Sequence, residues 1–307
     1  MSIRISGAPC CWGVDNVNNP HLPSWERVLD EASKAGYKGI ELGPYGYLPL
    51  DIDRVSVALN SRGLSIVAGT IFDDLVEENN LGNLVKQTHD ICSLLSKLPK
   101  LPQEEGQHFG APYLVLIDHV HSERSLVAGH PDEAPRLSRD KWRGTMSHIK
   151  TIAELASREY GIRAVVHPHA GGYIEFEDEI RQLITDIPYD VAGLCLDTGH
   201  LYYSRMDPVE WVRDNAERID YLHFKDIEPS VYARVMNQRM DFFDACAQGV
   251  MCPIGRGVVD YDAIYQLLNE IDYHGYITIE QERDPRNSDG SLADVTASLE
   301  YLKSKGF

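Results

Sequence analysis

The sequence predicts an α/β fold, a (β/α)8 TIM barrel that forms a single domain over residues 1–307. Short β-like apolar runs alternate along the whole chain with longer segments of helical periodicity. Strict alternation of this kind indicates a parallel sheet covered by helices. There are eight such runs, the number of strands that closes a barrel. No low-complexity linker divides the chain, so we expect one domain.

The expected strands are short runs rich in apolar and β-branched residues. In chain order they are Ile3–Ile5, Gly39–Leu42, Leu64–Ala68, Tyr113–Ile117, Arg163–Val166, Val191–Leu196, Ile219–His223 and Tyr276–Ile279. A doubly wound open sheet could use the same runs. However, "SGAPCCWG" after the first run lacks the glycine fingerprint GxGxxG, which favours the barrel.

The segments between the strands have apolar residues at three- and four-residue spacing, and a glycine often follows the last turn. Such helices are expected at Ser24–Tyr37, Asp53–Gly63, Lys141–Gly161 and Asp260–Gly275. Two connections, residues 118–139 and 227–257, are longer than a barrel needs. Both should lie at the carboxyl end of the strands, where long loops form lids and substrate walls.

Composition narrows the class of protein. The chain has 43% hydrophobic and 25% charged residues, and its net charge of −18 opposes binding to nucleic acid. Its six cysteines form no CxxC pair and no regular framework, which fits a reducing cytoplasm. The amino terminus is unlike a signal peptide, and no run approaches the length of a membrane span. We therefore expect a cytoplasmic protein that binds neither nucleic acid nor membrane.

Ionisable residues gather at the ends of the expected strands. They are Glu41, Asp118, His119, His167, His169, Asp197, His200, His223, Lys225, Asp226, Glu280 and Glu282. Each alone has an ordinary explanation: a hydrogen-bonded structural histidine, an Asx-type cap in "DTG", an ion pair between Lys225 and Asp226, or a solvated loop at Glu282. Together they favour a cation, because several carboxylates buried side by side are otherwise costly. Mixed histidine and carboxylate ligands suit Mn²⁺, Co²⁺, Zn²⁺ or Fe²⁺ better than Ca²⁺.

The chain resembles the xylose-isomerase-like superfamily of TIM barrels, and within it the inosose dehydratases of inositol catabolism. The matching segments are "GAPCCWG", "AGYKGIELGPYGYLP", "AVVHPHAGGYIE", "LDTGHLYYS", "YLHFKDI", "MDFFDACAQGVMCPIGRGVVDYDAI" and "GYITIEQERDP". Together they cover almost the whole chain in order.

The resemblance implies one divalent metal held by a residue from each of the last four strands. The matching positions are His167, Asp197, His223 and Glu280, with His169 as the alternative ligand on the fifth strand, where many relatives have Glu. It also implies a dehydratase acting on a keto-cyclitol such as 2-keto-myo-inositol, or alternatively a sugar or sugar-phosphate isomerase or epimerase. A homo-oligomer is compatible with this resemblance.

Both reactions begin by removing a proton next to a carbonyl, and a metal on that carbonyl stabilises the enolate. Mn²⁺ or Co²⁺ is favoured, and Zn²⁺, Fe²⁺ or Mg²⁺ stays open. The residues left for acid–base work are Glu41, His200, Lys225 and Glu282. Trp12, His169 and Glu282 are expected to contact a small polyol or keto-sugar substrate. A nuclease of the apurinic type would need a basic face, and a non-enzymatic sugar-binding protein would not need so many ionisable groups.

Overall fold

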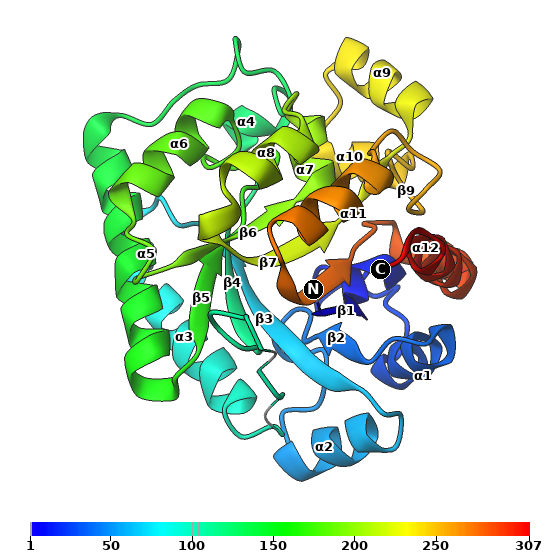
Figure 1. Cartoon of the computed structure of the whole chain (residues 1–307). Helices are drawn as coiled ribbons and strands as arrows, with labels where there is room; N and C mark the ends of the chain where they lie inside the picture. Colours follow the sequence, from blue (N-terminus) through cyan, green and yellow to red (C-terminus); the bar gives the residue numbers. More distant parts are fainter. Residues whose placement is uncertain (1, 100, 104) are drawn as a thin grey trace.

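The computed structural model describes residues 2–99, 101–103 and 105–307, and within them a closed barrel of parallel strands (Figure 1). The strands follow one another around the barrel in the order β1, β2, β3, β4, β5, β6, β7 and β10, and β10 pairs with β1 to close it. Their bounds are β1 Ser2–Gly7, β2 Gly39–Glu41, β3 Ser65–Asp73, β4 Tyr113–Asp118, β5 Arg163–Val166, β6 Gly193–Asp197, β7 Ile219–Phe224 and β10 His274–Ile279. The predicted eight-stranded barrel is confirmed.

Most strands differ from the expected bounds by one or two residues at an end, and the differences in β6 and β3 have clear local reasons. β6 begins at Gly193, two residues late, because the backbone N–H groups of Val191 and Ala192 both donate to the Pro188 carbonyl in a turn. β3 runs on to Asp73 because its second half pairs with β4 in register, Asp73 opposite Asp118. The longer β3 carries its loop to the mouth of the barrel.

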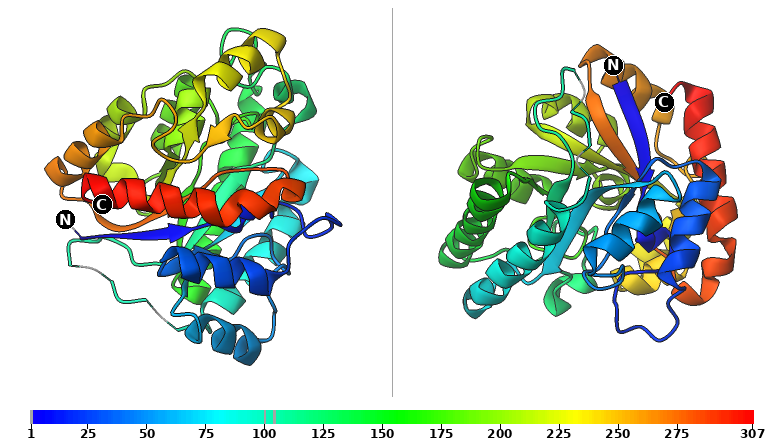
Figure 2. Two further views of the ribbon diagram at one scale, coloured as in Figure 1. Left: turned by 90° about the vertical axis from the view of Figure 1, so that its right-hand side faces the viewer. Right: turned by 90° about the horizontal axis from the view of Figure 1, so that it is seen from below.

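The helices cover the outside of the barrel (Figures 1 and 2). They are α1 Trp25–Ala35, α2 Ile52–Asn60, α3 Leu81–Leu95, α5 Arg139–Tyr160, α6 Glu177–Asp186, α7 Thr198–Tyr203, α8 Pro208–Asp214, α11 Tyr261–Glu270 and α12 Ser291–Lys305. Side-chain caps fix several starts: Ser24 accepts from the N–H of Arg27, and Ser138 from that of Lys141. None of the helices in the described ranges is long and apolar enough to cross a membrane.

The interior of the barrel is a packed core, which closes the amino-terminal end. Tyr113 and Tyr221 stack with ring centroids 4.9 Å apart, beside fully buried Val165 and Cys195. Cys195 is therefore core filler, the simpler of its two interpretations. Because the described residues fill the lower barrel, a ligand would reach the strands at their carboxyl ends.

The two long connections lie at this carboxyl end, as expected. Residues 118–139 contain the short helix α4 (Ser122–Ser125), and residues 227–257 contain α9 (Pro229–Gln238), α10 (Phe242–Ala247) and an antiparallel pair, β8 (Asp226–Ile227) with β9 (Met251–Cys252). The yellow segment in the upper part of the left view of Figure 2 holds α9 and α10. Asp226 anchors the second connection, since its carboxylate accepts the backbone N–H groups of Gly255, Gly257 and Val259 at 2.9–3.0 Å.

Candidate metal centre

Four strand ends bring a ligand set together. His167 follows β5, Asp197 ends β6, His223 lies in β7 and Glu280 follows β10, and one ligand atom from each lies within 4.8 Å of all the others. All four residues are buried. Ligands on opposite sides of one ion at usual bond lengths are about 4.4 Å apart, so only small shifts separate this arrangement from a coordination shell.

His223 is oriented by a carboxylate on the far side of its ring. Its Nε2 lies 2.8 Å from Oε1 of Glu41, which also accepts the Tyr221 hydroxyl at 2.7 Å. Nδ1 faces the centre and lies 3.0 Å from Glu280 and 3.9 Å from Asp197. With the Nε2 proton donated to Glu41, Nδ1 keeps its lone pair for a cation. Glu41, an expected acid or base, also lines the cavity, but here its oxygen is engaged in positioning His223.

Asp197 performs two tasks with its two oxygens. Oδ1 accepts the backbone N–H groups of Gly199 and His200 at 2.8 and 2.9 Å, which caps α7. Oδ2 faces the centre and lies 3.5 Å from Nε2 of His167 and 2.7 Å from Nζ of Lys225. Asp197 can therefore cap the "DTG" turn with one oxygen and bind a metal with the other.

Lys225 is fully buried among carboxylates. Its Nζ contacts Asp197, Glu280 and Glu282, the last at 2.9 Å. Burial opposes its charge, but these carboxylates outweigh burial and hold the pKa of Lys225 well above its ordinary value. Lys225 is therefore a fixed ammonium beside the ligand set. It does not form the expected alternative ion pair with Asp226, whose carboxylate is occupied by backbone N–H groups.

The ring nitrogens of the two candidate histidine ligands fit a metal. Within the described residues, both ring nitrogens of His167 are buried without a hydrogen-bond partner, and Nδ1 of His223 faces the carboxylates of Glu280 and Asp197. Such unpartnered nitrogens are rare in folded proteins, and a bound cation would satisfy them. Burial also lowers the pKa of His167, which favours the neutral imidazole that binds metals. The donor set therefore fits a divalent metal ion.

His169 and His200 lie beside the ligand set, and the centroids of their rings are 4.1 Å apart. His169 lines the cavity and donates from Nδ1 to the carbonyl of Ala170, 2.9 Å away, so its Nε2 is an acceptor. Nδ1 of His200 accepts the N–H of Ala170, so its Nε2 carries the proton and lies 3.8 Å from Oε1 of Glu282. Of the two fifth-strand histidines, His167 lies in the four-residue cluster.

Trp12 does not lie where it was expected. Its ring is fully buried, and its indole N–H donates to Glu31 of α1 at 2.6 Å, so it packs in the core and does not line the cavity. The expected contact between Trp12 and the substrate is therefore corrected. In the short helical turn Pro9–Trp12, successive side chains point in different directions, so Pro9 and Cys10 face the cavity and Trp12 faces the core.

A cavity of about 220 Å³ opens above the ligand set. His167, His223, Lys225, Glu280 and Glu282 form its charged part, and its walls include residues that the sequence did not single out: Cys10, Asp15, Tyr45, Phe72 and Phe243. Phe243 comes from the second long connection. The unusual length of that connection is the feature of the sequence that could have indicated a substrate wall there. Such a cavity can hold a small polar molecule against a cation, an ammonium and a carboxylate.

Comparison with known proteins gives a consistent result. The profile of the family described as "Xylose isomerase-like TIM barrel" matches residues 29–305. Inosose dehydratases from Clostridium botulinum and Geobacillus kaustophilus are 26% and 29% identical, covering 99% and 92% of this chain and 97% and 88% of their own. The rhizopine catabolism protein MocC of Rhizobium meliloti is 28% identical, covering 94% of this chain and 84% of its own.

Solved structures share the fold at lower identity. The IOLI protein, crystallised with a zinc atom, has a TM-score of 0.70 at 14% identity, and covers 99% of both chains. A probable 3-DHS dehydratase, AsbF of Bacillus anthracis, has a TM-score of 0.69 at 16% identity, and covers 98% of both. With the family profile covering most of its length, this chain belongs to the xylose isomerase-like TIM barrel family.

Proposed function

We propose that this protein is a divalent-metal-dependent hydro-lyase that removes water from a keto-cyclitol of the inosose type. The observation that carries the proposal is the cluster of His167, Asp197, His223 and Glu280 at the floor of a cavity, with the Lys225 ammonium beside it. Inosose dehydratases that align over nearly the whole chain support the same reaction. The substrate is a small polyol ketone. Cytoplasmic location and a homo-oligomer remain predictions.

The metal, when bound, supplies a Lewis acid for the substrate carbonyl and the charge that develops on it. Two imidazoles among the ligands favour Mn²⁺ or Co²⁺ over Mg²⁺, and Zn²⁺ or Fe²⁺ also suits them. His223 is held for this role by Glu41, and Asp197 by the first turn of α7.

Glu282 is the proposed base. One of its oxygens lies 2.9 Å from Lys225, and the other is buried without a hydrogen-bond partner among the described residues. It lines the cavity and is absent from the four-ligand set, so an oxygen remains for the proton next to the substrate carbonyl. Removing that proton leaves its electron pair in an enolate.

Lys225 is the proposed acid, because a cation on Asp197 and Glu280 would neutralise the carboxylates that hold its proton and so would make that proton easier to release. As the carbon–oxygen bond at the neighbouring carbon breaks, a proton from the Lys225 ammonium joins the departing hydroxyl, and the products are water and an unsaturated ketone. His169 offers Nε2 as an acceptor for a substrate hydroxyl, which orients the ring. His200 faces Glu282, with its Nε2–H 3.8 Å from Oε1, and does not line the cavity.

An isomerase or epimerase would use the same metal and base, so product analysis must separate the two reactions. Metal-loaded protein should convert inosose to a product that is lighter by one water and absorbs in the ultraviolet. Lys225→Met should lose this conversion, whereas Lys305→Met, which removes a surface ammonium paired with Asp262, should keep it. A product of unchanged mass would replace the dehydratase with the epimerase.

A further inference from the structure

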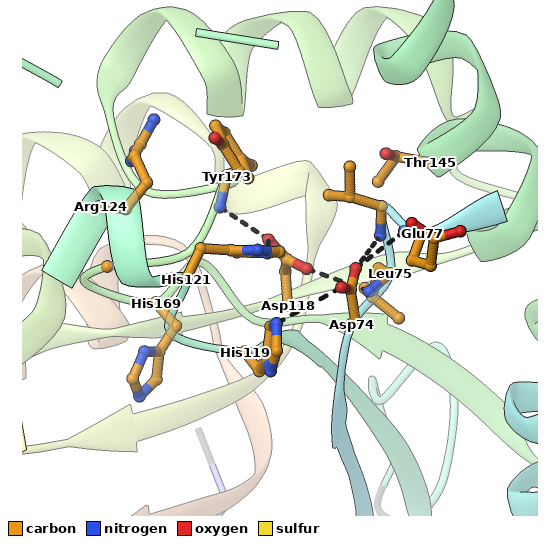
Figure 3. Close-up of polar contacts among 12 residues, drawn as sticks. Asp74, Leu75, Glu77, Asp118, His119, His121, Arg124, Thr145, His169 and Tyr173 are labelled. Carbon is orange, nitrogen blue, oxygen red and sulfur yellow. Dashed lines mark hydrogen bonds and ion pairs between the residues drawn. The ribbon is translucent and has the colours of Figure 1, made fainter. Parts of the chain in front are cut away.

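A second cluster of metal-binding side chains lies at the carboxyl ends of β3 and β4. Asp74 follows β3, and His119 and His121 follow β4, and one ligand atom from each lies within 4.8 Å of the others (Figure 3). None of the three lines the catalytic cavity. We propose that they form a second site for a divalent transition-metal ion, separate from the catalytic centre.

The Asp74 carboxylate is held with one oxygen free. Oδ1 accepts the backbone N–H groups of Val76 and Glu77, both at 2.8 Å. Oδ2 lies 3.6 Å from Nε2 of His119. The turn after β3 therefore fixes the carboxylate before any ion binds, which lowers the entropy cost of binding.

His121 has the carboxylate partner that metal-binding histidines usually have. One of its ring nitrogens, Nε2, lies 3.0 Å from Asp118, which leaves the other for a cation. Asp118 is itself buried and accepts the backbone N–H groups of Leu75 and Tyr173 at 3.1 and 2.7 Å. This support links the ends of β3, β4 and β5 behind the proposed ligand.

The charge of the cluster favours a cation. Within the described residues, the ion pairs of Asp74 and Asp118 are with His119 and His121 alone. Arg124, drawn nearby in Figure 3, is paired with Glu175 and Glu179. With neutral imidazoles, the two aspartates are left without a compensating charge, unlike the catalytic carboxylates, which share Lys225.

Two imidazoles and one carboxylate select Zn²⁺, Co²⁺ or Ni²⁺ over Mg²⁺ or Ca²⁺. Because His119 and Asp74 are partly exposed, water can complete the shell. An ion here would tie the loop after β3 to the loop after β4. Phe72 and Ile117, next to these loops, line the catalytic cavity, so the ion would stiffen that wall without taking part in the reaction.

The test is zinc stoichiometry by equilibrium dialysis on chelator-stripped full-length protein. Wild type should bind two zinc ions per chain, and His119→Gln and Asp74→Asn should each bind one. Asparagine keeps an oxygen for the Val76 and Glu77 N–H groups, so the turn should survive. The matched control is His89→Gln, because His89 also lies beside a single carboxylate, Glu159 at 3.8 Å, with similar exposure; it should still bind two.

Glu280→Gln separates the two sites, since it should remove only the catalytic ion and leave one zinc. One zinc in wild type that vanishes in Glu280→Gln would overturn the second site, as would two zinc ions in both His119→Gln and Asp74→Asn. If Glu280→Gln keeps two ions while His119→Gln has one, the second site stands and the assigned catalytic ligands are wrong.

Discussion

Replacing Lys225 by methionine should make the stability of the protein depend strongly on metal. The Lys225 ammonium is buried against Asp197, Glu280 and Glu282, and methionine keeps the length of the side chain without its charge. Removing one partner of a buried ion pair typically costs about 3–5 kcal/mol, because the remaining charges are left uncompensated. We expect a loss of about this size in the free energy of unfolding when chelator is present.

A bound divalent ion should recover much of that loss. An ion present at about 1,000 times its dissociation constant stabilises a folded protein by about 4 kcal/mol. The assay is urea unfolding followed by circular dichroism, in EDTA and in Mn²⁺. Lys305→Met is the control, because the Lys305 ion pair with Asp262 is partly exposed and exposed pairs contribute little to stability. If Lys225→Met in EDTA loses no more than Lys305→Met, the carboxylates are not held by Lys225 as argued.

Two further predictions concern α7 and the loop after β5. Asp197→Asn should lose metal, whereas His200→Gln should keep metal and lose turnover. Elemental analysis measures the metal content, and a rate assay measures the turnover. A metal-free His200→Gln protein would show that His200 belongs to the ligand set. Burial raises the pKa of Glu175 to about 7 although Arg124 opposes this. The folded state then holds a proton on Glu175 that the unfolded chain releases near pH 4.5. This bound proton stabilises the fold by up to about 3 kcal/mol; the stabilisation is complete below pH 4.5 and is lost as pH rises through 7. Glu175→Gln should flatten that part of the stability profile measured by urea unfolding, and an unchanged slope would show that Glu175 is ionised in the fold.

The gathering of ionisable residues at the barrel mouth could be predicted from the sequence because parallel strands end at one edge, and the family resemblance then singled out four of them as expected ligands. Apolar runs that stop at His167, Asp197, His223 and Glu280 place these groups at the mouth of a barrel once the strands are counted. The predicted helices and long connections followed from the same periodicity. None of these predictions required knowing which strands are neighbours, because strands that follow one another in the sequence are neighbours in this barrel.

Features that depend on rotation or on distant backbone could not be predicted in the same way. Trp12 and Cys10 are two residues apart in a helical turn, and only the packing of Trp12 against α1 decides which one faces the cavity. Asp226 looked like the neighbour of Lys225, but its partners are N–H groups about thirty residues further along the chain. His119 was recognised at a strand end, but His121 was not, and the position of both beside Asp74 depends on the turn after β3.

The proposed function requires a divalent ion on this ligand set for the elimination of water. The most direct measurement follows ultraviolet absorbance of inosose with chelator-stripped protein, before and after Mn²⁺ or Co²⁺ is added in excess. We expect no product in EDTA and recovery of turnover with Mn²⁺ or Co²⁺, more than with Mg²⁺. Full turnover in excess EDTA, by protein shown to contain no metal, would contradict it.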